Sequence, residues 1–170
     1  MKRLPKVSMR ALEPEDLEML YQLENDESIW DAGITNVPYS RHILLQYITQ
    51  SSYDIYVDRQ VRFVVENSEG KTIGLVDLQN FSPSHQRAEV GIVIKEEFRG
   101  NGYGEAALSQ LIGYVRRHLH LHQLYAVVSK DNEISLRLFD RLGFTTGALL
   151  EGWLFDGEKY HDSVIKQFFL

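Results

Sequence analysis

The stretch Arg99-Gly100-Asn101-Gly102-Tyr103-Gly104 lies between an apolar segment and a segment with helical periodicity. Its three glycines carry no Cβ atoms, so the backbone can turn sharply and direct several N–H groups at one anion. The helix that follows adds its own unpaired amides and the positive end of its dipole at the same point. The hexapeptide therefore predicts a phosphate-binding turn, and a plain tight turn is the structural alternative.

Two other glycine-rich phosphate motifs can be tested against the residues that follow. A P-loop needs Lys and then Ser or Thr after its last glycine, but Glu105 and Ala106 occupy those positions. Gly102, Gly104 and Ala107 fit the G-x-G-x-x-A pattern of a dinucleotide site, yet no acidic residue ends a strand about twenty positions later. Neither motif accounts for the turn.

Composition and charge limit the class of protein. The chain has 170 residues, is 44% apolar and 25% charged, and carries a formal net charge of −6. These values are typical of a soluble globular protein, and we interpret residues 1–170 as a single domain. The sequence contains no cysteine, which excludes disulfides, thiolate metal ligands and a covalent cysteine intermediate. The start, MKRLPKVSMR, lacks the apolar region of a signal peptide, so we expect a cytoplasmic protein that binds neither membrane nor nucleic acid.

Hydrophobic periodicity predicts an alternation of strands and helices. Strands are expected at 7–11, 61–66, 72–78, 87–94, 124–128, 144–154 and 159–169. Helices are expected to begin at residue 13 and to cover 40–50, 104–118 and 133–142, with an irregular segment at 25–38. Gly143 is predicted to end the last helix, and Asp156-Gly157 to turn the final hairpin.

This order of elements, with the glycine turn after the fourth strand, resembles the GNAT superfamily of acetyl-CoA-dependent N-acetyltransferases over essentially the whole chain. The residues that match the two motifs of the family are Arg99, Gly102, Gly104, Asn132, Ser135 and Leu142-Gly143-Phe144. The resemblance implies an α/β (α+β) fold, with a mixed, mostly antiparallel sheet of about seven strands flanked by about four helices. It also implies that the fourth and fifth strands splay apart.

Within the superfamily the chain is most similar to bacterial spermidine/spermine N-acetyltransferases. The segments that carry this likeness are Arg87-Ala88-Glu89, Asp131-Asn132-Glu133 and the Asp-Gly hairpin before Tyr160. Ribosomal-protein N-terminal acetyltransferases share much of the same pattern. The resemblance therefore implies acetyl transfer to a primary amine in a ternary complex, with a polyamine as the predicted substrate.

The resemblance assigns a cofactor site for acetyl-CoA. The implied cofactor-binding residues are Ile92, Val93, Ile94, Arg99, Gly100, Asn101, Gly102, Tyr103, Gly104 and Asn132. The amides of the glycine turn would bind the pyrophosphate, and the strand before it would pair its main chain with the pantetheine arm. A solvated turn residue is the alternative role for Arg99, and a helix N-cap is the alternative for Asn132.

The chemistry of the reaction calls for a carboxylate. An alkylammonium group with a pKa of about 10 must lose a proton before it can attack a thioester, and a carboxylate can accept that proton directly or through water. Glu89 matches the substrate-site glutamate of the polyamine branch and is our candidate for the catalytic and substrate-binding carboxylate; the alternative is an outward-facing residue paired with Arg87 or Arg62. Asp77, on the neighbouring strand, would add a substrate-binding charge. An acidic trough would then continue through Glu24, Asp26, Glu27 and Asp31.

One position departs from the family pattern. The family often carries a tyrosine in the helix after the Asn motif, where its hydroxyl can protonate the departing thiolate, and the corresponding residue here is Phe139. The general acid is therefore unassigned. Two other functions stay open: acetylation of a protein or peptide α-amine, and acetyl-CoA binding without catalysis.

Metal ions and assembly are the last features that the sequence addresses. His118, His120 and His122 lack an accompanying carboxylate, and we expect no metal, because a catalytic zinc site usually needs three protein ligands in one place. The final hairpin and the apolar C-terminus, Phe168-Phe169-Leu170, suit a subunit interface. We therefore expect a homodimer or a higher homo-oligomer.

Overall fold

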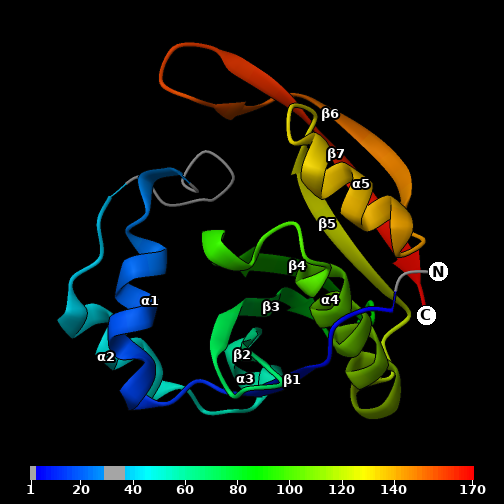
Figure 1. Ribbon diagram of the computed structural model, residues 1–170. Helices are drawn as coiled ribbons and strands as arrows, with labels where there is room; N and C mark the ends of the chain where they lie inside the picture. The colour runs from blue at the N-terminus through cyan, green and yellow to red at the C-terminus, as the bar shows by residue number, and fades with distance from the viewer. Residues whose placement is uncertain (1–2, 29–36) are drawn as a thin grey trace.

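The computed structural model describes residues 3–28 and 37–170 of the chain (Figure 1). The strands are β1 (Val7–Ala11), β2 (Val61–Asn67), β3 (Thr72–Ser82), β4 (Arg87–Ile94), β5 (Gln123–Ser129), β6 (Thr145–Phe155) and β7 (Tyr160–Phe169). The helices are η1 (Pro14–Asp16), α1 (Leu17–Glu24), α2 (Arg41–Gln50), α3 (Ile55–Asp58), η3 (Glu96–Phe98), α4 (Tyr103–Tyr114), η4 (Val115–Leu119) and α5 (Glu133–Arg141). Asp31, the last residue of the predicted acidic trough, lies outside the described residues.

The strands form one mixed sheet in the order β1-β2-β3-β4-β5-β7-β6. Every neighbouring pair is antiparallel except β4 and β5, which run parallel. The parallel pairing begins at Arg87 with Gln123 and ends at Glu89 with Tyr125. From Glu89 onward the two strands diverge (Figure 1). The predicted mixed sheet with splayed fourth and fifth strands is therefore confirmed.

Helices cover both faces of this sheet and create two apolar clusters. On one face α4 and α5 pack against the centre of the sheet; this cluster includes Val76, Leu78, Val90, Leu108, Leu111, Leu124 and Phe139. On the other face α1 and α2 cover β2 and β3; this cluster includes Leu20, Leu44, Ile48, Val64 and Leu75 (Figure 1). Burial of these side chains is the main force that holds the helices on the sheet.

The helix boundaries follow from local capping. Ser40 begins α2 by accepting a hydrogen bond from the amide of Ile43 at 3.2 Å. Gly143 adopts φ +89° after α5, and the amide of Phe144 reaches back to the carbonyl of Phe139 at 3.0 Å. This is the Schellman arrangement that a C-terminal glycine favours, so the prediction for Gly143 is confirmed.

Three features of the secondary structure differ from the sequence prediction. The described chain has five α-helices rather than about four, because Asp54 caps the short helix α3 by accepting from the amide of Tyr56 at 2.8 Å. Helix α4 ends at Tyr114, and the chain continues as the π-helical turn η4 instead of a regular helix to residue 118. Strand β3 continues to Ser82 through a bulge.

No helix in the described ranges is long and apolar enough to cross a membrane.

Candidate active site

The glycine turn leaves backbone amide groups without intrahelical partners at the start of α4. Gly100 and Gly102 adopt φ values of +74° and +84°, which residues with a Cβ atom rarely adopt. Gly102 is the N-cap residue of α4 and supplies no side-chain cap. The first amide bonded back to Gly102 is that of Ala106, at 3.0 Å, so the amides of residues 103–105 point out of the helix N-terminus. Backbone N–H groups in this arrangement suit a phosphate group.

The side chains around the turn hold it in shape and leave the main chain for a ligand. Arg99 donates from Nε to the carbonyl of Ile94 at 2.8 Å, and Asn101 donates to the carbonyl of Arg99 at 3.0 Å. The ring of Tyr103 packs edge-to-face on Phe98, with 5.9 Å between the ring centroids. Arg99 is thus an exposed residue that ties the turn to the end of β4.

Gly104 lets α4 pack closely against its neighbours. A Cβ atom at this position would lie 3.4 Å from Cδ2 of Leu138 and 3.8 Å from Cδ1 of Ile92. Ile92 belongs to the cluster beneath α4, whereas Val93 packs against the cluster beneath α1 and α2. The side chains of β4 point to the two faces of the sheet. A ligand that lies between β4 and β5 would therefore contact the main-chain N–H and C=O groups of β4.

Asn132 lies at the other side of the splay, where β5 gives way to α5. It is the N-cap residue of α5, and its side-chain carbonyl accepts from the amide of Ser135 at 3.0 Å. The structure thus gives Asn132 the capping role that the sequence left as an alternative. A cap does not exclude a cofactor contact, because the side-chain nitrogen takes no part in that bond.

Glu89 lies where β4 and β5 begin to separate. It is half-buried, and its Oε2 accepts a hydrogen bond from Nδ2 of Asn80 at 2.7 Å. In the described part of the chain Glu89 forms no ion pair, so the alternative pairing with Arg87 or Arg62 does not occur. The carboxylate therefore meets the requirement for a proton acceptor at the apex of the splay.

Asp77 is placed differently from the open acidic trough that the sequence predicted. Arg62 donates two hydrogen bonds to Asp77, from Nε to Oδ1 at 2.7 Å and from Nη2 to Oδ2 at 3.0 Å. The same guanidinium donates to Glu24 at 2.5 Å. Burial has the largest single effect and lowers the pKa of Arg62, but the charge and hydrogen bonds of Asp77, together with Tyr47 and Glu24, raise that pKa above its usual value. Two carboxylates and one guanidinium leave one net negative charge in this trio.

The end of α1 lies near the glycine turn. Asp26 accepts from the amide and the hydroxyl of Ser28, at 3.0 and 2.6 Å, and these bonds lower the pKa of its carboxyl. The positive charge of Arg99 lowers it further. Glu27, the next residue of the predicted trough, is exposed. Arg99 of the turn and the acidic residues that follow α1 therefore lie at one edge of the site.

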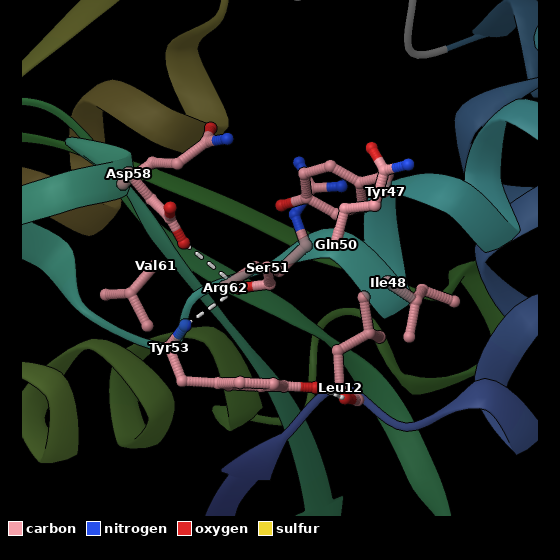
Figure 2. A pocket seen from close by; sticks show the side chains of 10 residues that line it. Leu12, Tyr47, Ile48, Gln50, Ser51, Tyr53, Asp58, Val61 and Arg62 are labelled. Atoms are coloured by element: carbon pink, nitrogen blue, oxygen red, sulfur yellow. Dashed lines mark hydrogen bonds between the residues drawn. The ribbon is translucent and has the colours of Figure 1, made fainter.

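Arg62 also lines a cavity of about 240 Å³ (Figure 2). Its lining residues are Leu12, Tyr47, Ile48, Gln50, Ser51, Tyr53, Asp58, Gln60, Val61 and Arg62. Its one carboxylate, Asp58, accepts from the hydroxyl of Ser51 at 3.1 Å, and the guanidinium of Arg62 lies 5.6 Å from the ring centre of Tyr47. Of the residues predicted as the site, none in the described ranges lines this cavity.

Phe139 belongs to the core. It is 3% exposed and packs edge-to-face on Phe144, with 5.0 Å between the ring centroids. This contact accompanies the C-terminal turn of α5, so both rings also stabilise the end of the helix. The position therefore has a packing role that a phenylalanine fills without a hydroxyl.

A charged cluster ties the turn end of the β6–β7 hairpin to Asp131, the residue before Asn132. The two ring nitrogens of His161 contact carboxylate oxygens of Asp131 and Asp156, each at 2.5 Å. The hydrogen bond to Asp156, followed by that to Asp131, raises the pKa of His161. His161 is not one of the three histidines, 118, 120 and 122, that suggested a metal site in the sequence. Across residues 3–28 and 37–170 no three side chains gather as metal ligands.

Two residues near Glu89 were missed by the sequence analysis. Asn80 donates to the carboxylate, and Tyr125 is its partner across the parallel pair of strands. Asn80 belongs to no motif, and its only signal is that Asn tolerates a left-handed backbone. Tyr125 could have been found by aligning the predicted fourth and fifth strands in parallel.

The fold and the candidate site suit a class of enzyme that binds a phosphate-bearing cofactor at a helix N-terminus, beside a sheet whose central strands separate next to a carboxylate. Residues 6–145 match the family model described as Acetyltransferase (GNAT) domain. The chain belongs to this family, whose members use acetyl-CoA, and the predicted resemblance is confirmed.

Individual relatives agree with this assignment. Spermidine N(1)-acetyltransferase of Escherichia coli (strain K12) is 34% identical over 155 residues, which cover 89% of this chain and 80% of that protein. The solved structure of spermidine N-acetyltransferase from Vibrio cholerae in complex with CoA and spermine has a TM-score of 0.85 at 28% identity, covering 96% of this chain and 95% of the other. A dodecameric structure of the same Vibrio enzyme has a TM-score of 0.81, also at 28% identity, with coverage of 96% and 93%.

Proposed function

We propose that this protein transfers the acetyl group of acetyl-CoA to a primary amine of a polyamine, with both substrates bound together. The observation that carries the proposal is the position of Glu89, half-buried where β4 and β5 separate and without an ion-pair partner among the described residues. The names of the relatives point to the same substrate class, because one is a spermidine acetyltransferase and another was solved with spermine.

The residues present fit acetyl-CoA. The outward amides of residues 103–105 and the two left-handed glycines at 100 and 102 form a cradle for the pyrophosphate. From Ile94 back to Glu89, five residue steps of strand span about 17 Å, a length suited to an extended arm that ends at the carboxylate. Asn132 would contact that arm from the start of α5. The cofactor supplies an activated thioester at the apex of the splay.

The chain contributes proton removal and orientation. Glu89 takes a proton from the bound ammonium group, and the neutral amine then forms the amide bond as the carbon–sulfur bond of the thioester breaks. The nitrogen releases its second proton to water in the same step. The departing thiol has a pKa of about 8.5, so a proton from water suffices where Phe139 offers none. The proton held by Glu89 returns to solvent.

Negative charge along the same edge favours a cationic substrate. The trio of Arg62, Asp77 and Glu24 carries one net negative charge, and Asp26 and Glu27 extend the acidic edge toward the glycine turn. A polyamine carries several ammonium groups, so a second group can lie against this edge while the first reaches Glu89.

The test measures thiol release from acetyl-CoA with spermidine, spermine, lysine, aminoglycosides and N-terminal peptides as acceptors. We expect turnover on the polyamines, and Glu89→Gln should lower kcat by about 10²- to 10⁴-fold without changing the Kd of acetyl-CoA. Glu69→Gln, in the exposed β2–β3 turn, is the matched control. A wild-type protein that binds CoA but leaves both polyamines unmodified would contradict the proposal.

Phe139 favours a second candidate, an acetyl-CoA-binding protein without catalysis. Saturable binding of acetyl-CoA with no turnover on any acceptor would support it. Turnover confined to peptides would instead indicate acetylation of α-amines.

We also propose that the protein assembles as a homo-oligomer through its C-terminal hairpin. Trp153 and Phe155 on β6 are each 59% exposed, and Tyr160 on β7 is 71% exposed. Large apolar side chains that gather on one surface are typical of interaction sites. The dodecameric Vibrio relative supports the same expectation. Light scattering coupled to size-exclusion chromatography tests it, and a monomeric mass at every protein concentration would contradict it.

A further inference from the structure

Strand β3 departs from regular geometry directly opposite Glu89. Its register pairs Gln79 with Glu89 and then Ser82 with Arg87, so Asn80 and Phe81 together face the single residue Ala88. Such a bulge redirects side chains locally. Asn80 sits in the left-handed region, with φ +50°.

The bulge decides where the side chain of Asn80 points. In a regular strand Gln79 shares the face of its partner Glu89, and residue 80 would point to the opposite face. Here the amide of Phe81 leaves the ladder and donates to the carbonyl of Arg59 at 3.0 Å, while its ring packs on Tyr56. This anchoring frees Asn80 to reach across to the carboxylate.

The resulting contact is a hydrogen bond to one oxygen of the proposed proton acceptor. Nδ2 of Asn80 donates to Oε2 of Glu89 at 2.7 Å, a short distance for an N–H donor. Among the described residues, Oε1 of Glu89 has no hydrogen-bond partner. One oxygen is therefore held by Asn80, and the other is left to accept a proton.

Tyr125, on β5, is the neighbour of Glu89 on the side opposite β3. It is the partner of Glu89 across the parallel pair. Burial, followed by the negative charge of Glu89, raises the pKa of its phenol. Glu89 thus lies between a donor on β3 and a ring on β5, which restricts the rotamers it can adopt.

From this geometry we propose that Asn80 is a positioning residue, which holds the carboxylate of Glu89 in the orientation that accepts the proton of the substrate ammonium group. The inference rests on the proposed function. A left-handed, non-glycine residue is costly, and such strain persists at functional sites when the surrounding structure enforces it.

The test compares Asn80→Gly with Gln86→Gly. Glycine suits the left-handed backbone, so Asn80→Gly removes the donor and keeps the bulge. Gln86 has the same φ of +50° and lies in the exposed loop between β3 and β4, which makes Gln86→Gly the control for backbone relief. Both variants should keep or raise the Tm.

We expect Asn80→Gly to lower kcat on spermidine by about 10- to 150-fold, the loss of one hydrogen bond to a charged group. The KM for acetyl-CoA should stay within twofold, and Gln86→Gly should match the wild type. Combined with Glu89→Gln, the Asn80→Gly change should cause no further loss, because the two residues act as a unit.

Each outcome separates this inference from the proposed function. Full activity in Asn80→Gly together with an inactive Glu89→Gln would overturn the role of Asn80 and leave that of Glu89 intact. Full activity in Glu89→Gln, or no amine turnover by the wild type, would overturn both.

Discussion

Gly100→Ala provides the sharpest test of the anion site, because the chain contains a matched control. Gly100 and Gly70 share a φ of +74°, and at both positions a Cβ atom would meet no heavy atom within 4 Å. Gly100 lies in the turn before α4, whereas Gly70 lies in the turn between β2 and β3. The two substitutions therefore impose the same backbone strain at a candidate site and at a neutral one.

The cost in stability should be the same for both variants. An alanine in the left-handed conformation is about 1–2 kcal/mol less stable than in its preferred conformations. For a domain of this size each kcal/mol lowers the Tm by roughly 2–4 °C, so both variants should melt about 2–8 °C below the wild type. Differential scanning fluorimetry without ligand checks this equality.

The cost in binding should differ. A strained Gly100→Ala turn misdirects at least one amide from the pyrophosphate, and a hydrogen bond to a charged group contributes about 1.5–3 kcal/mol. The Kd for CoA should therefore rise roughly 10- to 150-fold in Gly100→Ala and stay unchanged in Gly70→Ala. Isothermal titration calorimetry measures both. Equal loss of Tm with equal affinity for CoA would refute the assignment of the turn as the phosphate site.

Three further predictions concern the surroundings of the site. Arg62→Met leaves two part-buried carboxylates facing each other and should lower the free energy of unfolding in urea by about 3 kcal/mol; a loss below about 0.5 kcal/mol would mean that the trio is effectively solvated. Asp156 and Asp131 stabilise the charged form of His161 and so raise its pKa. The contribution of this cluster to the stability of the fold is therefore complete below a pH of about 6.5 and is lost as the pH rises through the raised pKa. The Tm difference between wild type and His161→Gln should shrink over that rise, and a difference that is constant from about pH 5 to 9 would contradict the cluster. In the family pattern a tyrosine at position 139 places its hydroxyl beside the departing thiolate, so Phe139→Tyr should raise kcat at least about tenfold in the thiol-release assay; an unchanged kcat would mean that water or another group supplies the proton.

Local signals accounted for most of the fold. Ser40, Asn132 and Gly143 each sit at the helix end that its residue type predicts. The hairpin at Asp156-Gly157 and the strand β4 also occur where the sequence indicated them. These features depend on hydrogen bonds that close within a few residues, so a short window of sequence contains both partners.

Contacts between segments far apart in the sequence could not be predicted from local sequence patterns. Arg62 was considered as a partner for Glu89, but it binds Asp77 on the next strand and Glu24 on α1. Asn80 reaches Glu89 only because a bulge changes the alternation of β3. A one-residue change in register moves a side chain to the other face of a sheet, and no local pattern fixed that register.

By itself the sequence determined the order of elements and the resemblance to the GNAT superfamily. It also predicted that the glycine turn binds an anion and that Glu89 is the carboxylate of the site. Only the tertiary structure decided which charges are free. Asp77 is paired with Arg62, while Glu89 has no ion-pair partner among the described residues and accepts the hydrogen bond from Asn80. The physical reason is that electrostatic partners are chosen by distance in space, and the sheet brings together residues that the chain separates by many positions.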